Sequence, residues 1–273
     1  MELIYNIIEF ILPFSFMEYD FMKNALLAIF IISPLFGLVG SMIVNNKMSF
    51  FSDALGHSAL TGIALGAILG ISNYSLSMVI FAILLNYIKN KKTASTDTII
   101  SVFSSVSIAL GLVLLSKYGG INKYSQYLVG DILSVTASEI LMLLIMLIVT
   151  VAIWFKLSNK LITISTDVSL ARAKGIKVQV IENIFGVLIA VLVMLTIKWV
   201  GILLINALLI LPAAAARNIS GNMREYTIYS ILFSLVAGFT GLILSYIFAV
   251  ATGPTIVVIS GIMYAITFVF RKR

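Results

Sequence analysis

One stretch of the chain, residues 50–70 (FFSDALGHSALTGIALGAILG), holds the residue pair best suited to chemistry. His57 is the only histidine in the 273-residue sequence, and Asp53 precedes it by four positions. Residues four apart share one face of a helix, so the carboxylate and the imidazole are predicted to meet. Together they suit a borderline divalent ion such as Zn²⁺ or Mn²⁺. A buried ion pair with a structural histidine is the alternative, because two ligands are too few for a closed site.

The same stretch carries a double G-x-x-x-G pattern. Gly62, Gly66 and Gly70 follow one another at four-residue spacing, well round the helix from Asp53 and His57. Small residues at this spacing let a second helix approach closely. We therefore predict one helix with an ionisable stripe and a separate packing stripe.

Three further polar residues are candidates for a transport path, and each has a structural alternative. Asp97 lies where a helix is expected to begin, so it could be an N-cap that also interacts with the helix dipole. Asp131 follows a Gly-containing loop and could belong to a turn. Asn206 lies in an apolar segment with Pro212, where an amide seeks a partner and helix packing is the simpler interpretation.

The composition requires a membrane. The chain is 61% hydrophobic, only 11% of its residues are charged, and it has no cysteine. A membrane span takes about 20 apolar residues, and the apolar runs here are that long. We expect an all-α integral membrane protein with residues 1–273 forming a single domain. The net charge of +7 then reflects basic residues gathered on the cytoplasmic side rather than binding to nucleic acid.

The apolar runs predict a polytopic bundle of about nine transmembrane helices. Residues 1–20 are expected to form an interfacial segment. The expected spans are residues 21–45, 54–70, 74–88, 98–116, 137–155, 180–197, 201–216, 226–250 and 255–270.

The distribution of basic residues predicts the orientation. Placing the N-terminus outside and the C-terminus in the cytoplasm puts most of the 18 Lys and Arg residues inside. The alternative is eight spans, if the sixth and seventh segments do not both cross. That topology would place Arg217 and Arg224 outside, which the charge bias disfavours.

The longest polar connection, residues 156–179, is predicted to face the cytoplasm. It contains DVSLARAKG, in which Asp167, Ala171 and Gly175 are spaced by four and Arg172 adds charge. One interpretation is a solvated basic loop that only sets topology. The other is a short helix that docks onto a cytoplasmic partner, with Ala171 and Gly175 on one face.

Several motifs are absent from the sequence. It has no G-x-x-x-x-G-K-[ST], so the chain does not bind ATP through a P-loop. It has no H-E-x-x-H or G-x-S-x-G, which leaves hydrolase chemistry without its groups. No arginine series or TVGYG filter marks a voltage-gated or potassium channel.

The ordered motifs resemble the permease subunits of bacterial ABC importers for zinc, manganese or iron. They cover nearly the whole chain, each is weak alone, and together they are specific. The matching pieces are Gly37–Ser41, Asn46–Met48, Ser52–Leu60 with Gly62 and Gly66, Asp97-Thr98, Gly130–Leu133, the Asp167/Ala171/Gly175 loop, Val200–Leu204 and Ala207–Ala214.

The resemblance implies a non-catalytic homodimer in the bacterial cytoplasmic membrane. It implies cytoplasmic ATPase subunits as the site of ATP hydrolysis and an extracytoplasmic metal-binding lipoprotein as the donor of metal. It also implies a metal path through Asp53 and His57, and coupling to the ATPase through residues 156–179. No permanently bound cofactor is expected, because the metal is the transported substrate.

The identity of the metal depends on a smaller feature. Manganese-type members tend to carry a proline before the glycine that follows the histidine, where this chain has Thr61. This favours zinc, with manganese or iron as alternatives. A stand-alone secondary metal transporter and a membrane enzyme using Asp53, His57 and Asp131 are the competing functions.

Overall fold

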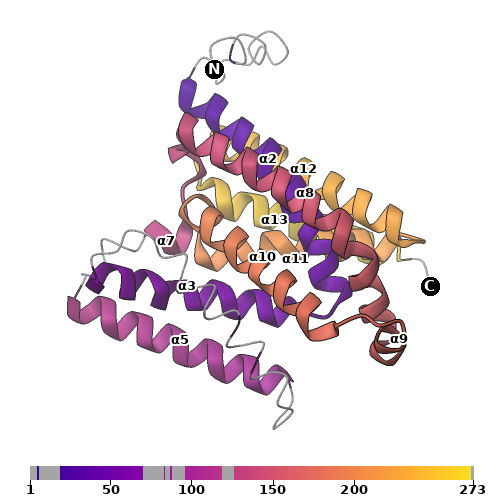
Figure 1. Ribbon diagram of the computed structural model, residues 1–273. Coiled ribbons are helices and arrows are strands. Elements are labelled where there is room, and N and C mark those ends of the chain that lie inside the picture. Colours follow the sequence, from indigo (N-terminus) through magenta and orange to yellow (C-terminus); the bar gives the residue numbers. More distant parts are fainter. Residues whose placement is uncertain are drawn as a thin grey trace. The chain divides into compact units, whose positions relative to one another are not determined.

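The computed structural model describes residues 19–69, 96–118 and 126–271, together with Tyr5, Ile83 and Tyr87. This part of the chain is helical and contains no strand, which confirms the all-α prediction (Figure 1). Its elements are α2 (Asp20–Asn45), α3 (Ser49–Leu69), α5 (Thr96–Tyr118), α7 (Gln126–Val129), the 3-10 helix η2 (Ile132–Ser134), α8 (Ala137–Thr166), α9 (Val168–Ala173), α10 (Val178–Val200), α11 (Ile202–Ile219), α12 (Met223–Phe248) and α13 (Thr252–Val269).

Six of the described helices are long and apolar enough to cross a membrane, namely α2, α5, α8, α10, α12 and α13. They coincide with six of the expected spans, while α3 and the shorter apolar helix within α11 coincide with two more. The expected span at residues 74–88 and the N-terminal segment up to residue 18 lie outside the described residues, apart from Tyr5, Ile83 and Tyr87. The nine-helix count and the orientation therefore stay predictions.

One expected boundary is wrong. The fifth span was predicted to end at Phe155, but α8 continues to Thr166. Within the added turns, Leu157, Leu161 and Ile164 are buried, and their spacing forms one apolar helix face. The helix therefore runs through Lys156 and the polar residues that follow it, and much of the predicted polar connection is helical.

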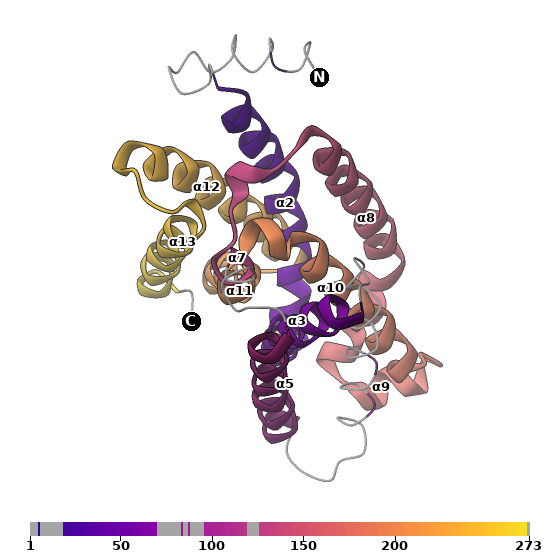
Figure 2. The same cartoon turned by 90° about the vertical axis from the view of Figure 1, so that its left-hand side faces the viewer.

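The chain divides into two compact units. The first comprises Met1–Ser41, Gly130–Thr150 and Ala207–Arg273, and the second comprises Met42–Val129 and Val151–Asn206. In the first unit, α12 and α13 lie side by side (Figures 1 and 2). A Cβ added at Gly241 of α12 would lie 2.4 Å from the Ile256 side chain of α13, so a small residue is needed at this contact.

In the same unit, small residues let α2 pack closely on α12. A Cβ at Gly37 would lie 2.6 Å from the Cα of Ile231, and the Ser230 hydroxyl donates to the Gly37 carbonyl at 2.7 Å. One turn earlier, Ser33 occupies the space beside Gly238. The four-residue spacing of Ser33 and Gly37 thus serves close helix packing.

In the second unit, three elements pack around α3. Helix α5 runs beside it (Figures 1 and 2), and the Thr61 hydroxyl donates to the Ser107 carbonyl of α5. From α10, Gly186 leaves room for Phe51, to which its Cβ would lie 3.0 Å away. The first turn of α11 approaches Gly56, whose Cβ would lie 3.7 Å from the Ile202 carbonyl. These contacts fix the helix that carries Asp53 and His57.

Candidate functional site

A tight turn between α2 and α3 sets the start of the helix that carries the site. The Met48 amide donates to the Ile43 carbonyl at 2.8 Å, and Lys47 adopts φ 55°, a left-handed conformation that usually favours glycine. Helix α3 then begins at Ser49. Asp53 and His57 consequently lie in the second and third turns of α3, on the same face as predicted.

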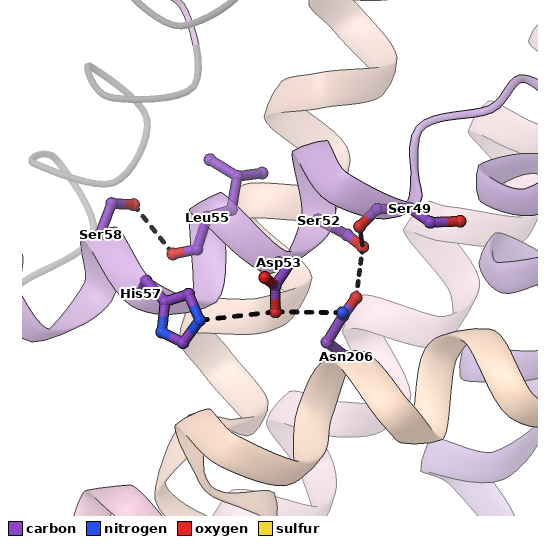
Figure 3. A network of polar contacts seen from close by, with 7 residues as sticks. All are labelled: Ser49, Ser52, Asp53, Leu55, His57, Ser58 and Asn206. Carbon is purple, nitrogen blue, oxygen red and sulfur yellow. Dashed lines mark hydrogen bonds and ion pairs between the residues drawn. The ribbon is translucent and has the colours of Figure 1, made fainter. Parts of the chain in front are cut away.

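The site centres on one carboxylate oxygen, Asp53 Oδ1 (Figure 3). His57 Nε2 lies 3.6 Å from it, and Asn206 Nδ2 donates to it at 3.1 Å. Asn206 comes from the start of the second turn of α11, so the network joins two elements that are about 150 positions apart in sequence. Of the predicted candidates, Asp53, His57 and Asn206 are therefore brought together.

Ser52 completes the network and was not predicted as a site residue. Its hydroxyl lies 2.6 Å from Asn206 Oδ1 and 2.9 Å from the Ser49 carbonyl (Figure 3). Ser52 is fully buried. Its position beside Asp53 gave no sign of this role, since the partner amide arrives from a distant segment.

The pair is open on one side. The side chain of His57 is 24% exposed and that of Asp53 is 41% exposed, so both remain reachable from outside the helix packing. Their 3.6 Å separation exceeds a hydrogen bond. Two ligands of a tetrahedral cation, each about 2.1 Å from it, lie roughly 3.4 Å apart, so one divalent ion would fit between these atoms.

The described residues contain no group of three or more His, Cys, Asp or Glu side chains that could hold a metal. An imidazole and a carboxylate alone form an incomplete coordination shell. Structural zinc sites are closed by four protein ligands, whereas sites with fewer keep an open position. A role for Asp53 and His57 in binding metal stays a prediction.

Asp131 does not join this cluster in any described contact, and the side chain of Asp97 lies outside the described part of the chain. Asp97 lies in the first turn of α5, which begins at Thr96, within one or two residues of the expected N-cap position. Asp131 is exposed and caps η2, with its side chain accepting from the Leu133 amide at 3.0 Å. The turn interpretation of Asp131 thus has a structural basis, and a path role for either residue stays a prediction.

The motif around Asp167, predicted to face the cytoplasm, forms a short helix whose ends are both capped. The Asp167 carboxylate accepts from the amides of Ser169 and Leu170 at the start of α9. At the other end, the amides of Gly175 and Ile176 donate to the Arg172 and Ala171 carbonyls. This pairing requires a left-handed residue, and Gly175 has φ 74°.

One detail of the docking interpretation, that Ala171 and Gly175 share a helix face, is therefore wrong, because α9 ends at Ala173 and Gly175 follows it. Ala171 is fully buried, whereas Arg172 and Gly175 are exposed. Asp167, Ala171 and Gly175 thus have local structural roles at the start, the buried face and the end of the motif.

Of the three glycines predicted to pack, only Gly62 can be assessed, and it is buried in α3. Gly66 lies within α3, and Gly70 lies outside the described residues. Packing through this stripe stays a prediction.

Comparisons with known proteins give a consistent result. A family model described as the ABC 3 transport family matches residues 18–271. The high-affinity zinc uptake system membrane protein ZnuB of Haemophilus influenzae is 29% identical over 259 residues, covering 93% of this chain and 99% of that protein. The manganese import system permease protein ScaB of Streptococcus gordonii is 31% identical over 263 residues, covering 94% and 93%.

A solved structure is also similar to this chain. It is that of PsaBC from Streptococcus pneumoniae in complex with Fab. The TM-score is 0.83 at 28% sequence identity, and the match covers 98% of this chain and 95% of that one.

Proposed function

Because this chain belongs to the ABC 3 transport family, we propose that it is the permease subunit of an ATP-driven importer of divalent transition metal ions. It is a multi-pass protein of the cytoplasmic membrane and is itself not an enzyme. The observation that carries the proposal is the partly exposed Asp53–His57 pair on α3, whose separation suits one shared cation.

Transport follows from two conformations with different access to this pair. A ligand or nucleotide shifts a protein between two states only by binding one of them better. Here the metal would favour a state in which Asp53, His57 and a third group converge. ATP, bound by partner subunits, would favour the state that releases the metal.

We propose α9 as the surface that receives the ATPase. Val168 and Leu170 are 40% and 44% exposed on this helix, and Arg172 adds a positive charge beside them. Exposed apolar side chains that lie together beside a charged residue are a candidate protein contact. The caps at Asp167 and Gly175 would hold the helix in one conformation.

Two further partners follow from the same function. An extracytoplasmic metal-binding lipoprotein would deliver the ion, and a second copy of the chain would complete the membrane domain. Both are proposals that rest on the family.

For the metal we propose zinc, with manganese as the alternative to be excluded. An imidazole ligand suits zinc, whereas manganese accepts a site made of carboxylates and carbonyls. Relatives named for zinc and for manganese match at similar identity. Thr61, which favoured zinc in the sequence, is buried and bonded to Ser107 of α5, so its identity also serves helix packing.

The proposal is tested by metal accumulation in cells that contain this chain with its ATPase and binding protein. Zinc, manganese and iron are compared, each with an active ATPase and with one that cannot hydrolyse ATP. ATP-dependent accumulation of zinc above the other metals is expected. Uptake that continues without hydrolysis would indicate a secondary transporter, and preference for manganese would overturn the zinc assignment.

A further inference from the structure

We infer that the side-chain amide of Asn206 turns over when metal binds, so that its oxygen becomes a third metal ligand, with Ser52 satisfying the amide in both orientations. This inference rests on the proposed function, because it completes the ligand set of the Asp53–His57 site.

The orientation in the structure is the one that a metal-free site requires. A carboxylate only accepts hydrogen bonds, so Asn206 directs Nδ2 at Asp53 Oδ1 over 3.1 Å and Oδ1 at Ser52 over 2.6 Å. A cation at Asp53 Oδ1 would face the N–H group of that amide, which cannot coordinate it. The observed amide orientation therefore opposes metal binding.

Ser52 makes the reverse orientation available. Its hydroxyl has one hydrogen but two acceptors in reach, Asn206 Oδ1 at 2.6 Å and the Ser49 carbonyl at 2.9 Å. When the hydrogen points to Ser49, the Ser52 oxygen can accept from Asn206 Nδ2. The amide can thus turn over without leaving a polar group of this part-buried contact unpaired.

The reversed amide would meet the geometry of a shared ion. Its oxygen would take the place of Nδ2, 3.1 Å from Asp53 Oδ1, while His57 Nε2 stays 3.6 Å from that atom. Ligands about 2.1 Å from one cation lie roughly 3.0 to 3.4 Å apart for bond angles between about 90° and 109°. Both separations are close to this range, and three ligands leave the cation an open position.

The reversal of the Asn206 amide would also ease release of the metal ion. When the ion leaves, Asp53 regains the N–H of Asn206. Its side chain is 41% exposed, so water also solvates the carboxylate, and the returning donor adds one charge-assisted hydrogen bond that lowers the free-energy cost of emptying the site.

Zinc binding to the purified full chain in lipid nanodiscs, measured with Zn²⁺ alone, tests the ligand role. Asn206→Leu keeps the size of the side chain and removes its oxygen, and we expect affinity to fall at least about tenfold. If Asn206 acts only as a donor to Asp53, the same substitution removes a competitor of the metal. Unchanged or tighter binding would therefore overturn the inference.

Asn206→Asp keeps an oxygen and needs no reversal, so it should retain zinc affinity, and a loss comparable to that of Asn206→Leu would contradict the inference. Asp53→Ala in the same assay separates the proposed metal site at Asp53 and His57 from the inferred ligand role of Asn206. If Asp53→Ala binds zinc normally, the proposed site itself fails. If it loses binding while Asn206→Leu does not, only the present inference fails.

Ser52→Ala tests the hydroxyl. It should weaken zinc binding roughly fivefold, because the reversed N–H loses its acceptor and an orphaned N–H costs more than an orphaned carbonyl. In a chain that already carries Asn206→Asp, which has no side-chain N–H to satisfy, Ser52→Ala should not weaken zinc binding. Equal losses in both backgrounds would show that Ser52 acts independently of the amide and would overturn the reversal.

Ser58→Ala is the matched control. Ser58 is equally buried on α3 and donates to the Leu55 carbonyl at 2.8 Å, also three residues back. We expect it to bind zinc like the parent chain, and a loss equal to that of Ser52→Ala would contradict the assignment.

A measurement on the unsubstituted chain does not depend on the folding of any variant. Zn²⁺ should move the carbon-13 resonance of the Asn206 side-chain carbonyl but not that of Asn218, a buried asparagine bonded to Thr267. An unmoved Asn206 resonance at saturating zinc would overturn the inference.

Discussion

At the scale of single residues, Asp53 Oδ1 is where the contacts of the site converge. An imidazole lies 3.6 Å from it on the same helix, and an amide from α11 donates to it at 3.1 Å. Because the side chains of Asp53 and His57 remain partly exposed, an ion can reach this oxygen without unpacking α3. The first coordination contact is therefore proposed to form at Asp53.

Thr61 permits a prediction about metal choice. Thr61→Val keeps the shape of the side chain and removes the hydroxyl that bonds to Ser107. We expect a loss of about 1 kcal/mol in the free energy of unfolding, measured by thermal unfolding in detergent, with the order of metal uptake unchanged. A switch from zinc to manganese would instead show that Thr61 itself selects the metal.

The pairing of Asp53 with His57 was predictable from the sequence, because a spacing of four on a helix brings side chains together. The roles of Asn206 and Ser52 were not. Asn206 was one of three polar candidates, and nothing in the local sequence indicated that it would meet Asp53 rather than Asp97 or Asp131. That contact depends on how α11 packs on α3, which is a property of the fold.

At the scale of elements, small residues decide how closely the helices approach. Gly37→Ala would place a methyl group 2.6 Å from the backbone of Ile231, which cannot move as a side chain could. We expect destabilisation of about 2 kcal/mol or more, seen as a lower unfolding temperature of the full chain.

Gly261→Ala is the control for that substitution. Its Cβ would meet nothing within 4 Å, and it lies inside α13. Alanine is the better helix former by about 0.8 to 1 kcal/mol, so this variant should unfold at the same or a higher temperature. Equal destabilisation by both substitutions would show that the contact with α12 is unimportant.

Helix α9 supports a second prediction at this scale. Gly175 also has open space around it, so the cost of Gly175→Ala would come from its left-handed φ of 74° and not from a clash. The strain is about 1 to 2 kcal/mol. Hydrogen exchange of the Ile176 amide, which bonds to Ala171, should accelerate roughly tenfold, and unchanged exchange would contradict the capping role.

The helix boundaries show what composition can and cannot predict. Six of the long apolar runs were assigned correctly as possible spans, because few soluble or loop segments have that composition. The end of α8 was missed because Lys156 and its polar neighbours suggested a loop, whereas Leu157, Leu161 and Ile164 continue a buried face. The spacing of Asp167, Ala171 and Gly175 was noticed, but it marks a capped helix rather than one helix face.

At the scale of the whole molecule, transport requires that a cytoplasmic event alter access to α3. Leu170→Asp places a charge on the exposed apolar surface of α9, and we expect at least tenfold less ATPase subunit to co-purify with the chain. Ser169→Asp adds the same charge at the neighbouring exposed position without removing an apolar group. If both variants retain the ATPase equally, α9 is not the docking surface.

The central claim is that Asp53 and His57 carry the transported ion. The most direct test is zinc accumulation by the complete importer with His57→Ala or Asp53→Ala, beside Ser58→Ala as the buried control on the same helix. We expect uptake to be abolished in the first two variants and retained in the third, with the ATPase co-purifying normally in all. Normal zinc uptake by both His57→Ala and Asp53→Ala would contradict the account.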